Sequence, residues 1–113
     1  MKPYLNKKQS SNTYVSKNYQ TSLYVMQGNL LHGVSTSLAP PVLRIDIGLN
    51  EGWLYNTEGH VLAVNAVRAD KSKIQLADPW ILYAEIGTTS YYQMDASLVH
   101  QAVTASQYCG YIY

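Results

Sequence analysis

Apolar and polar residues alternate through much of this chain, which is the period-two pattern of a β-strand with one buried face. Between residues 59 and 67, His60, Leu62 and Val64 fall on one face of such a strand and the intervening residues on the other. Similar runs predict strands at 42–47, 59–67, 74–77, 90–93 and 108–113, with a short strand around Tyr14-Val15. The polar residues 70–73 separate two of these runs and predict a hairpin.

Two segments have helical spacing instead. Leu23, Met26 and Leu30 recur on one helical face after Thr21 or Ser22 as the N-cap, and this helix is expected to end between 33 and 36. A shorter helix is expected after Asp95, with 98, 99 and 102 as its apolar side. The pattern therefore predicts an α+β fold, a mostly antiparallel sheet with two short helices. We expect residues 1–20 to be an extended or loop segment and residues 21–113 to form one α+β half-domain.

The composition limits the classes of function. Charged residues make up 13% of the 113 residues and the formal net charge is +1. The lysines near the start are interleaved with polar residues, so nucleic-acid binding through a basic field is not expected. Eleven tyrosines and no phenylalanine give large rings with a hydroxyl that needs water or a partner. Such a surface suits a polar groove, an interface or an extracellular protein.

The remaining composition argues against metals and membranes. The single cysteine, Cys109, excludes an internal disulfide and a Cys-rich zinc site, and the three dispersed histidines do not predict a metal site. We expect no cofactor. No apolar run approaches the roughly 20 residues of a membrane span, and Met1 is not followed by a visible signal peptide. The compartment stays open, with a secreted or cell-surface location among the alternatives.

The hairpin brings two chemically useful residues together. If Arg68 pairs with Ser72, the residue opposite His60 is Trp80, two places beyond Asp78. His60 and Asp78 are therefore expected to lie side by side at one end of the sheet. An aspartate that accepts from an imidazole N–H fixes its tautomer and stabilises the imidazolium, which is the orienter and base half of a nucleophilic triad. Both residues also have a structural reading, His60 as a hydrogen-bonded core histidine and Asp78 as the end of a strand before Pro79.

Gly59-His60 with its apolar run, the polar turn, and a branched strand that ends in Asp78-Pro79 resemble the His/Asp half of papain-like cysteine peptidases of the bacteriocin-leader-processing type. The preceding helix and the proline-initiated strand follow the same order as in that family, and the similarity extends over roughly residues 23–113. The resemblance implies the β-lobe of a papain-like fold, with peptide-bond hydrolysis in which His60 is the base and Asp78 orients it. It also places Trp53 and Tyr55 beside the cleft, where they either line a peptide groove or pack the loop down as a latch.

The nucleophile of that family is missing from this chain. The family's cysteine opens a helix well before the histidine, whereas no cysteine precedes His60 and Cys109 lies near the end of the sequence. The chain is therefore expected to be inactive alone, as a fragment, as a subunit completed by a Cys-bearing partner half, or as a degenerate relative. The alternative is a non-catalytic peptide- or protein-binding module, either a pseudopeptidase or an inhibitor-like protein. A small structural β-rich protein is a third reading. A half-domain should expose apolar sheet surface, so we also expect a tight partner or a homo-oligomer.

Overall fold

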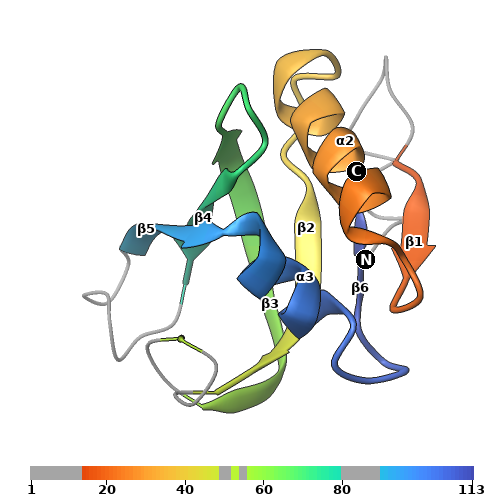
Figure 1. Ribbon diagram of the computed structural model, residues 1–113, viewed down its shortest axis with the longest axis vertical. Helices are drawn as coiled ribbons and strands as arrows, with labels where there is room; N and C mark the ends of the chain where they lie inside the picture. Colours follow the sequence, from red (N-terminus) through yellow and green to blue (C-terminus); the bar gives the residue numbers. More distant parts are fainter. Residues whose placement is uncertain (1–13, 49–51, 54–55, 80–89) are drawn as a thin grey trace.

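The computed structural model describes residues 14–48, 52–53, 56–79 and 90–113, which form a six-stranded antiparallel sheet and two helices (Figure 1). The strands lie in the order β1-β6-β2-β3-β4-β5. In chain order the elements are β1 (Ser16–Asn18), α2 (Leu23–Ser35), β2 (Val42–Ile47), β3 (Thr57–Val67), β4 (Lys73–Asp78), β5 (Ser90–Asp95), α3 (Ala96–Val103) and β6 (Gly110–Ile112). The predicted α+β class with a mostly antiparallel sheet and two short helices is confirmed.

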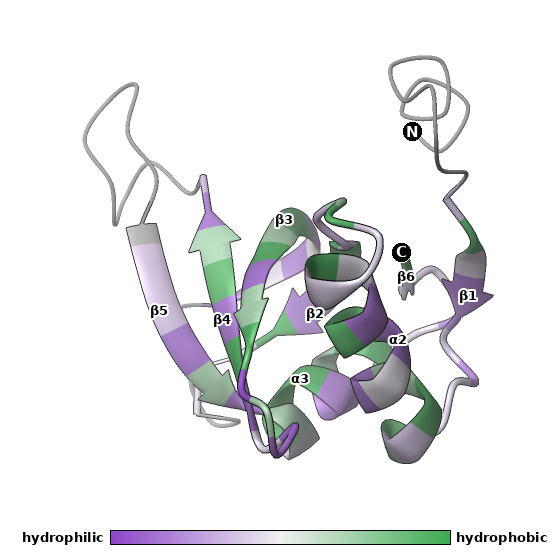
Figure 2. Ribbon diagram, turned by 90° about the horizontal axis from the view of Figure 1, so that it is seen from above, coloured by the Kyte–Doolittle hydropathy of each residue, from purple (hydrophilic) through white to green (hydrophobic). Residues whose placement is uncertain are grey.

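Both helices cover the same face of the sheet, as the two perpendicular views show (Figures 1 and 2). Helix α2 inserts Met26 and Leu30, and α3 inserts Val99 and Val103, all of which are fully buried. The strands contribute their inward-facing residues to the same core, including Leu43, Ile45, Leu62, Val64, Ile74 and Leu76. The alternation seen in the sequence therefore separates a helix-covered face from a face that the described helices leave uncovered.

The predicted boundaries differ from the observed ones by a few residues. The first strand lies at Ser16–Asn18 rather than at Tyr14-Val15, although Val15 still exchanges two backbone hydrogen bonds with Tyr113. The end of the segment expected as extended or loop is thus part of the sheet. Asp95 is the N-cap residue of α3 as expected, but its side chain makes no capping bond and contacts Lys73 instead. The predictions for Tyr55 and Trp80 lie outside the described residues.

A β-bulge adjusts the hairpin between β3 and β4. Near the turn, Val67 pairs with Ile74, one residue away from the register expected from the sequence. The register then shifts between Val64 and Ala66, so that Ala63 pairs with Ala77. Because this second pairing matches the expected one, the end of the hairpin that holds His60 and Asp78 has the predicted alignment.

Candidate functional site

A glycine bulge places His60 in β3. Gly59 has φ of +63°, a left-handed conformation that suits glycine, and its N–H donates to Asp46 Oδ1 at 2.7 Å. The pairing of β2 with β3 shifts at this point, because Ile45 lies opposite His60 while Ile47 lies opposite Thr57. From His60 onward the strand alternates regularly, and the imidazole falls on the helix-covered face with Leu62 and Val64. The left-handed backbone at the bulge thus explains why a glycine precedes His60.

Asp78 is the last residue of β4 and points to the same face. Its Oδ1 lies 2.7 Å from His60 Nε2, and the two side chains are 1% and 8% exposed. With the carboxylate as acceptor, the proton of the neutral imidazole resides on Nε2, and Nδ1 lies on the opposite side of the ring. Pro79 follows directly and cannot continue the ladder, which ends the strand at the carboxylate. The sequence predicted this contact, and the structure brings the two residues together.

Tyr92 in β5 provides a second donor, which the sequence did not lead us to expect. Its hydroxyl donates to Asp78 Oδ2 at 2.5 Å, so each oxygen of this carboxylate has a partner on a neighbouring strand. Tyr92 pairs with Leu76, two residues from Asp78 along β4, and therefore lies diagonally across from the carboxylate. A hydroxyl-bearing ring on the inward face of a predicted strand was the only signal in the sequence.

Trp53 approaches this group of side chains through Tyr92. The two rings meet edge to face, with centroids 6.5 Å apart and an interplanar angle of 86°. Trp53 is 3% exposed, and its indole N–H has no hydrogen-bond partner within the described part of the chain. The neighbouring Gly52 lies against Leu98 of α3. Of the two alternatives for Trp53, this position agrees with a packed latch over the site. Its other predicted companion, Tyr55, lies outside the described residues.

Cys109 is not beside the imidazole. It precedes β6, and β2 lies between β6 and the strand of His60. Since Gly110 pairs with Arg44 and Ile45 pairs with His60, the backbones of Cys109 and His60 are two strand spacings apart, about 10 Å. The thiol is buried and lies 3.4 Å from Ser106 Oγ. Because β2 separates the two residues, the Cys109 thiol does not contact the His60 imidazole.

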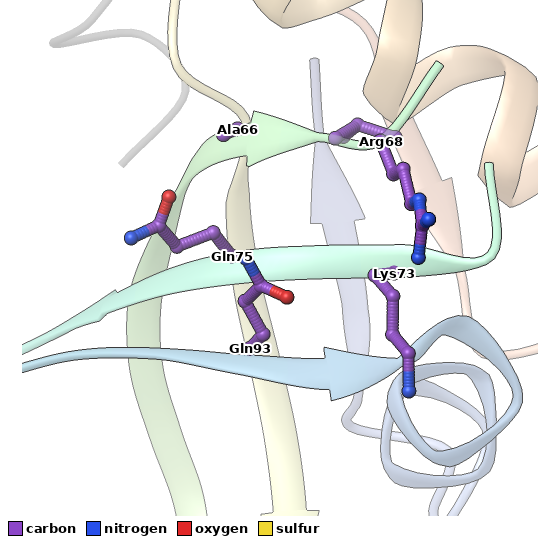
Figure 3. A pocket seen from close by; sticks show the side chains of 6 residues that line it. Ala66, Arg68, Lys73, Gln75 and Gln93 are labelled. Atoms are coloured by element: carbon purple, nitrogen blue, oxygen red, sulfur yellow. The ribbon is translucent and has the colours of Figure 1, made fainter. Parts of the chain in front are cut away.

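A polar hollow lies elsewhere on the sheet, with a volume of about 270 Å³ (Figure 3). Gln75 of β4 and Gln93 of β5 are cross-strand partners in it, and Arg68 and Lys73 stand at one end. Lys73 and Gln75 alternate with the buried Ile74 and Leu76, so this hollow opens on the face that the helices leave uncovered. Its side chains supply amide and cationic groups that could bind a polar ligand.

The described residues show neither a metal-binding cluster nor a membrane-spanning helix. Across residues 14–48, 52–53, 56–79 and 90–113, no group of three or more His, Cys, Asp or Glu side chains is arranged to hold a metal ion. Neither described helix is long and apolar enough to span a membrane. Comparisons with protein-family models, with curated proteins and with solved structures find no match to this chain.

Proposed function

We propose that this chain is the His- and Asp-bearing half of a papain-like cysteine peptidase, completed by a Cys-bearing half that another chain or segment supplies. The observation that supports this most is the 2.7 Å contact between His60 Nε2 and Asp78 Oδ1 on adjacent strands. A histidine followed by a strand, a turn and a strand-ending aspartate is the arrangement that the sequence resemblance implies.

In the completed site, each residue has one task. His60 removes the proton of the incoming thiol as a general base and later returns a proton to the leaving amine as a general acid. Asp78 holds the imidazole at Nε2, so that Nδ1 is the nitrogen that faces the thiol, and it stabilises the imidazolium that forms. The reaction is hydrolysis of a peptide bond in a peptide or protein substrate, and these steps need no cofactor.

To test this, the chain is purified from the cells that produce it, in complex with the proteins that it binds there. The complex is then treated with a thiol-directed peptide epoxide. We expect one thiol in the complex to be labelled rapidly and a fluorogenic peptide to be cleaved. His60→Ala should abolish both while the complex still forms. His32→Ala is the matched control, because His32 is exposed near the end of α2. Equal labelling in the wild type and in His60→Ala would contradict the proposal.

The second candidate is a non-catalytic peptide- or protein-binding module. Two observations favour it: the imidazole is only 8% exposed, and the polar hollow at Gln75 and Gln93 opens on the uncovered face beside the edge strand β5. Amide side chains can hydrogen-bond to the backbone of an extended peptide, and an edge strand can pair with one.

An array of unstructured hexapeptides tests this alternative. If the hollow binds peptides, the double variant Gln75→Ala and Gln93→Ala should no longer bind the hexapeptides that the wild type binds. The control variant Gln101→Ala, on the exposed side of α3, should still bind them. If the double variant and the wild type bind the same hexapeptides equally, the hollow is not the binding site.

A further inference from the structure

The bond between Tyr92 and Asp78 has no role in the function proposed above. Asp78 is almost fully buried, and an isolated carboxylate at such a position is expensive unless its oxygens have donors. His60 occupies one oxygen and Tyr92 the other. We propose that Tyr92 is a positioning residue, whose hydroxyl holds the Asp78 carboxylate in the orientation that aligns it with His60. This inference rests on the proposed function only for its catalytic meaning, since the alignment itself belongs to the chain alone.

The physical reason is the rotational freedom of a carboxylate. A donor on Oδ1 alone leaves a carboxylate freedom about its terminal torsion, which is broad and roughly two-fold. The Tyr92 hydroxyl on Oδ2, from a different strand, restricts this torsion. Bonds from O–H and N–H donors to a carboxylate are among the shorter and stronger ones, so two of them from different strands restrict the group firmly.

Tyr92 is itself held in place. Its ring lies on the inward face of β5, and the buried ring of Trp53 packs against it edge to face. An edge-to-face pair restricts the tilt of both rings. Since the hydroxyl lies on the ring axis, restricting the tilt keeps the hydroxyl aimed at Asp78 Oδ2. Trp53 thus bears on the alignment of Asp78 with His60 through the ring of Tyr92.

The test observes the proton between His60 and Asp78. In the ¹⁵N-labelled chain, the Nε2 proton of His60 should give a resolved resonance that exchanges slowly with water. Tyr92→Phe retains the ring and removes the hydroxyl, and we expect exchange to become roughly tenfold faster or more, the factor that corresponds to losing one hydrogen bond to a charged group. Tyr91→Phe is the control, because this substitution removes the same hydroxyl from the neighbouring residue, whose ring lies on the exposed face. Unchanged exchange in Tyr92→Phe would overturn the proposal.

Loss of the fold must be separated from loss of alignment. The backbone amides of Leu62 and Leu76 are the internal standard, because both residues lie in the core beside the pair. Faster exchange at His60 with unchanged exchange at these amides supports positioning, whereas equal acceleration at all three indicates general destabilisation and contradicts it.

A measurement on the wild type needs no substitution. At a temperature and pH at which the Tyr92 hydroxyl exchanges slowly on the NMR timescale, deuterium on this hydroxyl in mixed H₂O and D₂O should split the His60 proton resonance into two lines, because both bonds share one carboxylate. A single line under slow exchange would overturn the inference. Neither experiment depends on peptidase activity, so the proposed function can fail while the positioning role of Tyr92 stands, and the reverse.

Discussion

Asp78 combines burial with two donors, which makes it the single side chain whose change should cost most at the candidate site. An asparagine at this position keeps one acceptor oxygen but turns an amide N–H₂ toward either His60 or Tyr92, both of which already donate. We expect Asp78→Asn to lower the free energy of unfolding by about 2–4 kcal/mol, the range for unsatisfied buried groups and broken buried pairs. Urea unfolding at neutral pH measures this loss.

Asp95→Asn is the matched control for that substitution. Asp95 pairs with Lys73 at the surface, where both side chains are roughly half exposed. An exposed ion pair contributes between 0 and about 1 kcal/mol, so this variant should stay close to the wild type. Equal losses for Asp78→Asn and Asp95→Asn would mean that the buried network has no special weight.

At the level of residues, the sequence predicted the contact between His60 and Asp78 but missed Tyr92. The first two residues belong to one hairpin whose turn is visible at 70–73, so their proximity follows from counting along two strands. Tyr92 reaches Asp78 from β5, which is separated from β4 by a stretch with no clear period. Nothing in a single sequence states that β5 pairs with β4, so a third member of the site could not be inferred.

Among the elements, two glycines in different environments give opposite predictions for the same substitution. Gly28 lies within α2, and a methyl group there would meet no described atom within 4 Å apart from its chain neighbours and the backbone of the helix itself. Because glycine costs about 0.5–1 kcal/mol relative to alanine inside a helix, Gly28→Ala should stabilise the protein by about that amount. The shift of the thermal unfolding midpoint is the measurement.

Gly110 begins β6 and faces β1, where a methyl group would lie 2.4 Å from the backbone oxygen of Lys17. Neither backbone can yield without separating the strands. Gly110→Ala should therefore destabilise the protein by roughly 1–3 kcal/mol and accelerate amide exchange in β1, in contrast to Gly28→Ala. If Gly110→Ala is as stable as the wild type or more stable, the close pairing of β1 with β6 is wrong.

The turn between β3 and β4 provides a test of pH dependence. Hydrogen bonds from the side chain and then the backbone of Ser72 lower the pKa of Asp70 from its ordinary value of 3.8. A lowered folded-state pKa gives stability that is present above the unfolded value and is lost as the pH falls through the folded one. The stability difference between wild type and Asp70→Asn should therefore be constant from neutral pH down to about pH 5 and shrink below about pH 4. Urea midpoints of both proteins at pH 7 and pH 3 give this difference, and an equal difference at both would contradict the prediction.

Element types were predictable because their periodicities are strong, whereas their edges depend on tertiary contacts. Strand β3 begins at Thr57, two residues before the expected start at Gly59, because the glycine bulge continues the ladder with β2 instead of opening it. Similarly, the short β1 is fixed by its pairing with β6 rather than by its own alternation. The side of the sheet that each helix covers could not be predicted, since either face of an alternating strand can accept an amphipathic helix.

For the whole molecule, the uncovered face of the sheet has a feature that bears on association. One cross-strand row on this face is apolar from β6 to β5, and its members, in order, are Ile112, Val42, Ala63, Ala77 and Tyr91. The two alanines leave a low stretch between larger side chains, and the Tyr91 ring is 60% exposed at the edge strand. A continuous apolar row on an open sheet favours contact with another apolar surface. We therefore predict that the purified chain self-associates at micromolar concentration, and that the proposed Cys-bearing half would compete with this association.

Sedimentation velocity across a concentration series measures this association. Ala77→Lys places a charge at the centre of the apolar row, where contact with a second apolar surface would leave it without water, and we expect the dissociation constant to rise about tenfold or more. Gln101→Lys adds the same charge on the exposed side of α3 and should leave the association unchanged. If the wild type sediments as a monomer at every concentration, the uncovered face of the sheet is stable in water. This result would contradict the proposal that the chain is an incomplete half-domain. If both lysine variants dissociate equally, net charge rather than the apolar row controls the contact.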